Sequence, residues 1–122
     1  MKTLLIVDDQ AGIRLLLNEV FSKEGFETTL AANGMEALQF VSEKIPDCIL
    51  LDMRMPGLSG VEVLKRIKKQ SADVPVIMMT AYGEIELTEE AFQHGAERYF
   101  TKPFNIYEVR DAVVEIVNRN KH

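Results

Sequence analysis

The chain has 122 residues, of which 47% are hydrophobic, and its formal net charge is −5. That length is enough for one domain with a single core. The negative charge argues against nucleic acid as a direct partner, because binding to a phosphate backbone requires clustered Lys and Arg. The one cysteine, Cys48, excludes an intramolecular disulfide and lies in an apolar run, where a buried neutral thiol is expected. No apolar stretch reaches the length of a membrane span and no signal-peptide pattern is present, so we expect a soluble cytoplasmic protein.

Strand and helix patterns alternate five times along the chain, which predicts a parallel five-stranded sheet with helices on both faces. The predicted strands are 3–7, 27–31, 47–51, 75–79 and 98–101, and the predicted helices are 11–24, 34–44, 59–69, 85–94 and 106–119. Short loops and right-handed crossovers favour a single doubly wound α/β domain of the flavodoxin type, with strand order 2-1-3-4-5.

The helices differ in how strongly their patterns predict burial. The first ends at Gly25, a suitable left-handed cap residue, and carries apolar residues at helical spacing: Ile13, Leu16, Leu17, Val20 and Phe21. The third begins at Ser59 with Glu62 three residues later, which is capping-box spacing. Its basic residues indicate a solvated face: Lys65, Arg66, Lys68 and Lys69. The fourth has few apolar positions among several acids, Glu84 included, and we expect low local stability there.

Polar residues directly follow several predicted strands. Asp8 and Asp9 follow the first strand, Asp52 the third, Thr80 the fourth and Lys102 the fifth. The carboxyl ends of parallel strands meet at one edge of the sheet, where such folds bind their ligands. Taken singly, each residue has a structural explanation, as a helix cap, a first-turn acid or a surface charge. Together they favour a site for phosphate and a divalent metal, because converging carboxylates are costly unless they bind something.

These residues, at these spacings, resemble the receiver domain of two-component response regulators, over essentially the whole chain. The resemblance implies that Asp52 is the phosphoacceptor, which attacks a phosphohistidine and forms an acyl phosphate. It also implies a bound Mg²⁺, for which Mn²⁺ or another divalent cation can substitute. Asp9, Asp52 and the backbone carbonyl of Arg54 would ligate the metal directly, with Asp8 acting through water. Thr80 and Lys102 would contact the phosphoryl oxygens.

Further roles follow from the same resemblance. Tyr99 occupies the position of an aromatic switch residue, for which an ordinary half-buried strand tyrosine is the alternative. Arg54 and Tyr82, two residues beyond Asp52 and Thr80, would modulate the hydrolysis of the acyl phosphate. The peptide bond before Pro103 is typically cis in this family.

Within the family, the first helix and the loops around Thr80 and Lys102 are most similar to single-domain regulators of the Bacillus-type sporulation phosphorelay. Ala11 and Tyr99 depart from them, standing at a tyrosine and a histidine position. The similarity implies a monomeric relay intermediate over residues 1–122, without an output domain. Its partners would be sensor histidine kinases, a four-helix-bundle histidine phosphotransferase and an aspartyl-phosphate phosphatase. The expected docking residues are Gln10, Ile13, Arg14, Pro103 and Phe104.

Three other functions stay open on the sequence alone. A chemotaxis-type receiver, which binds a target once phosphorylated, would share every residue of the site. A multi-turnover phosphatase with an aspartate nucleophile usually carries an acid two residues after it, where this chain has Arg54. A flavin-binding module would place Asp8 and Asp9 against an anionic phosphate, which is unfavourable. The chain is thus phosphotransferase-like, without the pattern of a conventional multi-turnover enzyme.

Overall fold

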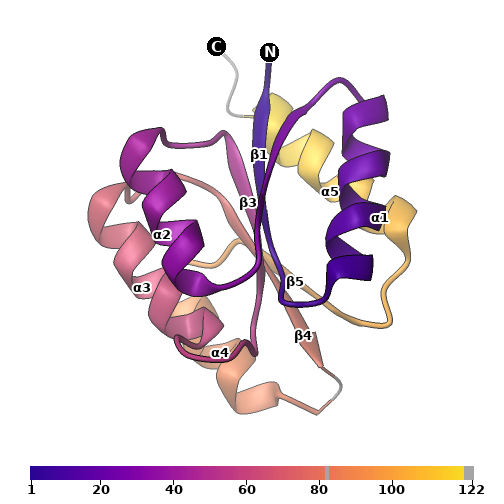
Figure 1. Cartoon of the computed structure of the whole chain (residues 1–122). Coiled ribbons are helices and arrows are strands. Elements are labelled where there is room, and N and C mark those ends of the chain that lie inside the picture. The colour runs from indigo at the N-terminus through magenta and orange to yellow at the C-terminus, as the bar shows by residue number, and fades with distance from the viewer. Residues whose placement is uncertain (82, 120–122) are drawn as a thin grey trace.

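The computed structural model describes residues 1–81 and 83–119, which form a parallel sheet between two layers of helices (Figure 1). The strands are β1 (Thr3–Val7), β2 (Glu27–Ala31), β3 (Cys48–Asp52), β4 (Val76–Ala81) and β5 (Arg98–Lys102). The helices are α1 (Ala11–Lys23), α2 (Gly34–Glu43), α3 (Gly60–Gln70), α4 (Ile85–Gln93) and α5 (Ile106–Arg119). The strand order is β2-β1-β3-β4-β5, and each neighbouring pair is parallel. The predicted doubly wound fold and strand order are confirmed.

The core is divided by the sheet into two apolar clusters, one on each face. Helices α1 and α5 cover one face, and α2, α3 and α4 cover the other (Figure 1). All five residues of the central strand β3 are buried, and Cys48 is among them. A strand enclosed on both faces requires a continuous apolar run, which explains the sequence of β3. The only exception in that run is its last residue, Asp52.

Capping residues fix the ends of three helices, and two of them, Ser59 and Gly25, are the cap residues that the sequence predicts. Ser59 Oγ accepts a hydrogen bond from the backbone N–H of Glu62 at 3.3 Å, at the start of α3. Asn33 Oδ1 accepts from the N–H of Glu36 at 2.9 Å, at the start of α2. Gly25, just beyond α1, has a φ of 90°. Such a backbone conformation favours glycine, and it lets the chain leave the helix and enter β2.

Two helical surfaces differ in how they meet the sheet. Of the residues in α4, Ala91 alone is buried, which agrees with the sparse apolar pattern of that helix. Leu16, one of the apolar positions at helical spacing in α1, is instead 44% exposed, and its neighbour Leu15 is 63% exposed. The buried stripe of α1 consists of Leu17 and Phe21, with a four-residue spacing that returns to the same side of a helix.

Candidate functional site

The carboxyl ends of four strands deliver the predicted site residues to one edge of the sheet. Asp52 is the last residue of β3 and Lys102 the last of β5, while Asp8 directly follows β1. Thr80 is the fifth residue of β4 and pairs with Thr101 of β5. Asp8, Asp52 and Thr80 are the buried polar or charged residues among those described, with exposures of 0%, 5% and 2%. Elsewhere in the described part of the chain, polar and charged residues are at least partly exposed to solvent.

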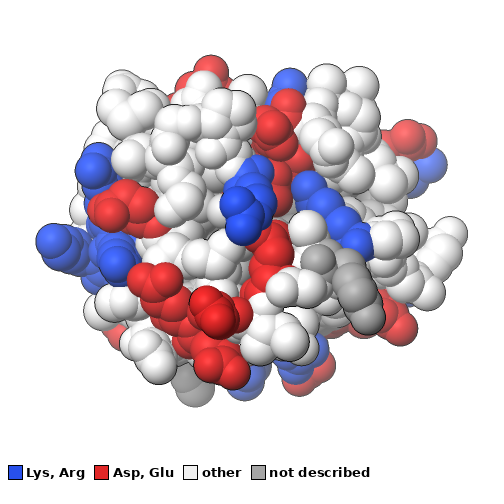
Figure 2. All heavy atoms as spheres, turned by 90° about the horizontal axis from the view of Figure 1, so that it is seen from below, with Lys and Arg blue, Asp and Glu red and all other residues white. Residues whose placement is uncertain are grey.

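Three carboxylates converge at this edge. Each of Asp8, Asp9 and Asp52 offers an oxygen, and these oxygens lie within 4.8 Å of one another. Asp9 is exposed, whereas the other two are buried. Viewed from the end where the strands finish, acidic and basic side chains lie side by side near the middle of the surface (Figure 2). A set of hard oxygen donors at this separation fits a divalent cation such as Mg²⁺.

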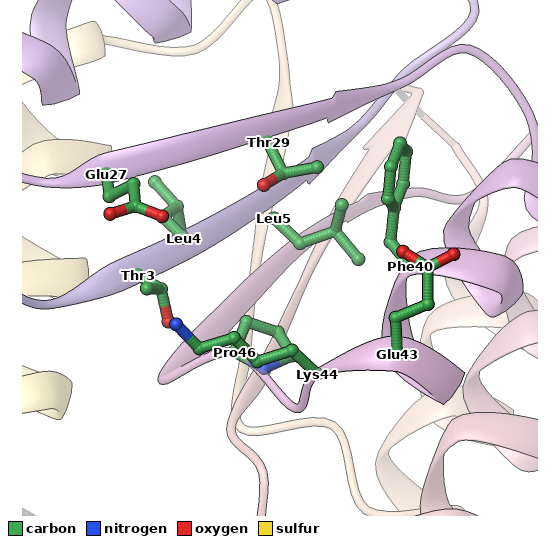
Figure 3. Close-up of a pocket in the computed structure, with 9 residues that line it drawn as sticks. All are labelled: Thr3, Leu4, Leu5, Glu27, Thr29, Phe40, Glu43, Lys44 and Pro46. Atoms are coloured by element: carbon green, nitrogen blue, oxygen red, sulfur yellow. The ribbon is translucent and has the colours of Figure 1, made fainter.

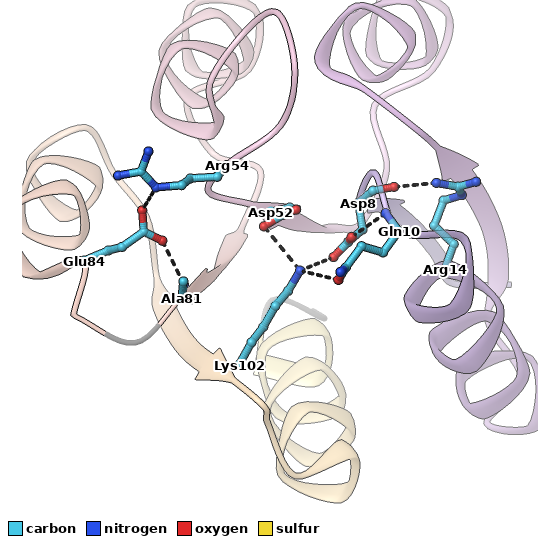
Figure 4. Close-up of polar contacts among 8 residues, drawn as sticks. All are labelled: Asp8, Gln10, Arg14, Asp52, Arg54, Ala81, Glu84 and Lys102. Carbon is cyan, nitrogen blue, oxygen red and sulfur yellow. Dashed lines mark hydrogen bonds and ion pairs between the residues drawn. The ribbon is translucent and has the colours of Figure 1, made fainter.

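The Lys102 ammonium lies between two of these acids (Figure 4). Its Nζ donates to Asp8 Oδ2 at 2.8 Å and lies 3.4 Å from Asp52 Oδ1. It also donates to Gln10 Oε1 at 3.4 Å. Burial alone would lower the pKa of Lys102, but its hydrogen bond to Asp8 and the charges of Asp52 and Asp8 raise it. Lys102 therefore stays protonated at neutral pH. The peptide bond between Lys102 and Pro103 is cis.

The charge state of Asp52 is set by its surroundings. Burial and the nearby Asp8 carboxylate raise the pKa of Asp52 to about 7, against the opposing effects of Lys102 and the Arg54 backbone. An ordinary aspartate titrates near 3.8. Since burial and the repulsion by Asp8 outweigh the attraction of Lys102, a further cation near the carboxylates would favour ionised Asp52. Such a shift is typical of functional sites.

Both carboxylate oxygens of Asp8 already have partners. Oδ1 accepts from the backbone N–H of Gln10 at 2.9 Å, and Oδ2 accepts from Lys102. The Asp8 carbonyl accepts from Arg14 Nη1 at 2.7 Å. Asp8 thus acts as the hub of the site, held from β5 on one side and from α1 on the other. Asp9 and Asp52 have more open coordination capacity for a metal.

A second polar connection closes the other side of the site, and sequence reasoning missed one of its members. Arg54 donates to Glu84 Oε2, and Glu84 Oε1 accepts from the backbone N–H of Ala81 at 2.8 Å (Figure 4). The Glu84 side chain is only 9% exposed, although the sequence suggests one more surface acid of the fourth helix. The one available signal was its position directly before α4, next to the carboxyl end of β4.

The predicted docking residues lie around the same edge. Gln10 and Pro103 are exposed, whereas Ile13, Arg14 and Phe104 are half-buried. Ile13 and Phe104 pack against the apolar cluster that α1 and α5 cover, so each is partly a core residue. The surface beside Lys102 is therefore mixed, with a polar side chain and a proline outside and apolar side chains beneath.

The predicted switch residue Tyr99 points outward from β5 and is 48% exposed. Its ring meets Phe92 of α4 edge-on, with centroids 5.8 Å apart. A hollow of about 520 Å³ lies beside these rings and is also lined by Ile85 and Thr88. Tyr82, predicted to modulate hydrolysis, lies outside the described residues.

Other features of the chain lie apart from this site. A cavity of about 140 Å³ is lined by Thr3, Leu5, Phe40 and Pro46, near the amino ends of β1 and β3 (Figure 3). It lies at the opposite edge of the sheet from the three acids. Burial raises the pKa of Cys48 to about 12, which confirms the expected neutral thiol. Among the described residues, no helix is long and apolar enough to cross a membrane.

Comparison with known proteins decides the family. Residues 4–114 match the response regulator receiver domain. The chain belongs to the response regulator receiver family. As a receiver domain of two-component signalling, it is expected to interact with histidine kinases and phosphotransfer partners. Receiver domains bind Mg²⁺ at a cluster of aspartates, and Asp8, Asp9 and Asp52 form such a cluster here.

Relatives of the receiver domain differ in how much of their own length this chain covers. Sporulation initiation phosphotransferase F of Bacillus subtilis (strain 168) is 56% identical over 110 residues, which cover 90% of this chain and 89% of the relative. The regulatory protein AtoC of Escherichia coli (strain K12) is 42% identical over 106 residues, but this chain spans only 23% of its length. Among solved structures, the receiver domain of the Francisella response regulator 1452 has a TM-score of 0.91 and 34% identity, covering 99% of this chain and 100% of that one.

Proposed function

We propose that the protein is a phosphorelay intermediate. It accepts a phosphoryl group on Asp52 from a sensor histidine kinase and passes it to a histidine phosphotransferase. The observation that carries this proposal is the setting of Asp52: a buried carboxylate at a strand end, 3.4 Å from the Lys102 ammonium and clustered with two further aspartates. The similarity to sporulation initiation phosphotransferase F over nearly the whole of both chains supports the relay and a role in sporulation control.

In the proposed uptake step, an Asp52 carboxylate oxygen attacks the phosphorus of a phosphohistidine. The new P–O bond forms as the P–N bond breaks, and the electron pair of the P–N bond stays on the imidazole nitrogen. The attack requires the ionised carboxylate, which the raised pKa of Asp52 disfavours near neutral pH without a cation. Lys102 lies beside the Asp52 carboxylate and is placed to contact the phosphoryl oxygens. Transfer onward is the same exchange in reverse, with a different histidine.

The three aspartates would contribute to metal binding in different ways. Asp9 and Asp52, with the backbone carbonyl of Arg54, would hold Mg²⁺ or a substituting divalent cation directly. Asp8 would act through water, since Gln10 and Lys102 already engage its two oxygens. When bound, the cation supplies neutralisation of the charge that the phosphoryl oxygens carry. Its charge would also offset the repulsion that keeps the pKa of Asp52 high.

The switch and the docking surface complete the proposal. Thr80 would hydrogen-bond a phosphoryl oxygen and Tyr99 would move inward from its present place against Phe92, which would change the surface around α4. A helix carrying a histidine would dock at the edge beside Asp52, between the first turn of α1 and the loop before α5. The residues proposed for this contact are Gln10, Ile13, Arg14, Pro103 and Phe104. Arg54 and Tyr82 would set the lifetime of the acyl phosphate.

The test is to follow the intact mass of the protein after incubation with Mg²⁺ and a small phosphodonor such as acetyl phosphate. A single phosphoryl adduct is expected, which Asp52→Asn and chelation of Mg²⁺ both abolish. Adding a purified histidine phosphotransferase bundle should shorten the lifetime of the adduct and place the phosphoryl group on the bundle. An adduct that decays equally fast with and without the bundle would overturn the relay and favour a terminal receiver, and no adduct would overturn phosphorylation itself.

A further inference from the structure

The main chain of Asp8 is bound by Arg14, a residue on the next element of the fold. Nη1 of Arg14 lies 2.7 Å from the Asp8 carbonyl oxygen (Figure 4). The Arg14 backbone N–H bonds the Gln10 carbonyl at 3.1 Å. The Asp8 N–H in turn bonds the carbonyl of Ala31 on the edge strand at 3.1 Å. The Arg14 side chain therefore holds the peptide group that joins Asp8 to Asp9, while its backbone N–H makes the ordinary first hydrogen bond of α1.

This side-chain contact matters because α1 begins without a side-chain cap. The N-cap residue Gln10 makes no side-chain capping hydrogen bond, and the first turn contains no acidic residue. Side-chain caps and first-turn acids are what usually fix the entry into a helix. The remaining bond within the segment is the one from the Gln10 N–H to Asp8 Oδ1, which closes a short Asx-type turn. The conformation at Asp9 thus depends on Asp8 and Arg14.

We propose that Arg14 is a positioning residue for the acidic site, an inference that rests on the proposed function. By fixing the Asp8 carbonyl, Arg14 holds the exposed Asp9 carboxylate within reach of the Asp8 and Asp52 carboxylates. The three acids then present a ready set of oxygens to a divalent cation. Groups that orient metal ligands in this way commonly change metal affinity about 10- to 100-fold when they are removed.

The charge of Arg14 alone predicts the opposite change in Mg²⁺ affinity, so the direction of the change on removing Arg14 tests the proposal. The guanidinium of Arg14 is a positive charge bound to the residue at the hub of the acidic site. Removing a positive charge near a cation site should strengthen cation binding. If Arg14 acted only through its charge, its loss would tighten Mg²⁺ binding. If it positions Asp9, its loss weakens Mg²⁺ binding.

The experiment is calorimetric titration of the unphosphorylated full chain with Mg²⁺, without any phosphodonor. Arg14→Ala should weaken Mg²⁺ binding about 10-fold or more. Arg66→Ala is the matched control, because it removes the same side chain from α3, where its partner Glu62 lies one turn away. This control should leave the affinity unchanged. Arg14→Lys retains the charge and one donor, and it should bind Mg²⁺ more tightly than Arg14→Ala.

Thermal unfolding of each variant in the absence of Mg²⁺ separates a positioning effect from loss of the fold. Unchanged or tighter binding by a folded Arg14→Ala would overturn the proposal, as would an equal loss in Arg66→Ala. A parent protein that does not bind Mg²⁺ would also overturn it. The mass adduct on Asp52 is a separate readout, so failure of the positioning role is distinguishable from failure of the proposed phosphorylation.

Discussion

Strand β3 has an aspartate at each end, and the two side chains lie in opposite surroundings. Asp47, just before the strand, is exposed, and its Oδ2 accepts from the Thr3 N–H at 2.8 Å and from the Thr3 hydroxyl at 3.2 Å. Its own N–H bonds the Thr3 carbonyl at 3.1 Å. Asp52, at the other end, is buried beside Asp8 and Asp9, and it shares the Lys102 ammonium with Asp8.

The difference shows what each end of the sheet is built for. At the amino end, a carboxylate with two neutral donors in solvent stabilises the start of two strands. At the carboxyl end, burial raises the pKa of Asp52 to about 7, which marks a carboxylate whose ionisation the fold disfavours. The acidic residues at the carboxyl end, where a ligand is expected, thus lower the stability of the fold, whereas Asp47 at the amino end raises it.

The largest predicted effect is on stability after Asp52→Asn in the absence of divalent cations. The folded pKa of Asp52 lies near 7 and its ordinary value is 3.8, so the folded state binds the proton more tightly. Parent stability should therefore fall as pH rises from about 4 to about 7 and stay low above. The amide does not titrate, and above pH 7 it should stabilise the chain by up to about 4 kcal/mol. Denaturant titrations at several pH values measure this.

A lower stability of Asp52→Asn above pH 7 would contradict the proposed difference between the two ends of β3. Asp47→Asn provides the contrast, since it alters an aspartate of the same strand outside the acidic cluster. Adding Mg²⁺ should stabilise the parent protein and not Asp52→Asn to the same extent, because the cation requires the carboxylate.

A smaller effect is predicted for Gly60→Ala, at the start of α3. A Cβ at Gly60 would lie 2.4 Å from the Asp52 carbonyl oxygen and 2.7 Å from Met53 Cα, both of which are backbone atoms. The backbone that carries Asp52 would have to shift, at a cost of about 1–3 kcal/mol. Gly12→Ala is the matched control, because nothing lies within 4 Å of its Cβ and α1 should gain about 0.5–1 kcal/mol. Equal effects of the two substitutions on thermal unfolding would contradict this account of Gly60.

The smallest effect is predicted at the amino end. Asp47→Ala removes the acceptor for the Thr3 N–H and hydroxyl, which water can partly replace because the site is exposed. The expected loss of stability is about 1 kcal/mol, and phosphoryl uptake should not change. Urea unfolding measures the loss of stability, and the mass-shift assay on the same sample measures phosphoryl uptake. A loss of uptake would show that the two ends are not independent.

Much of this structure could be predicted from the sequence, because its signals are local. Alternating apolar runs and helical spacings predicted the strands and helices, and short loops with right-handed crossovers predicted their order in the sheet. Polar residues directly after the predicted strands indicated Asp8, Asp52, Thr80 and Lys102. An acid directly after an apolar run is a short-range pattern in the sequence. In a parallel sheet the carboxyl ends of the strands lie at one edge, so these separate residues meet in one site.

The long-range contacts between side chains and backbone could not be predicted in the same way. The pairing of Thr3 with Asp47 and that of Arg54 with Glu84 join residues 44 and 30 positions apart, and no periodicity marks them. The contact of Arg14 with the Asp8 carbonyl depends on a side-chain conformation, and the sequence suggested only a docking role for Arg14. Leu16 lies at helical spacing, yet the sheet covers only a narrow stripe of α1.

The central claim is that the carboxyl end of β3 carries the phosphoacceptor and the amino end does not. The most direct measurement is reduction of the phosphorylated protein with borohydride, which converts a phosphorylated aspartate into homoserine, followed by peptide mass spectrometry. If Asp52 is the phosphoacceptor, homoserine is expected at position 52, dependent on Mg²⁺, with unmodified aspartate at position 47. Homoserine at any other aspartate, or none after a phosphoryl adduct has formed, would contradict it.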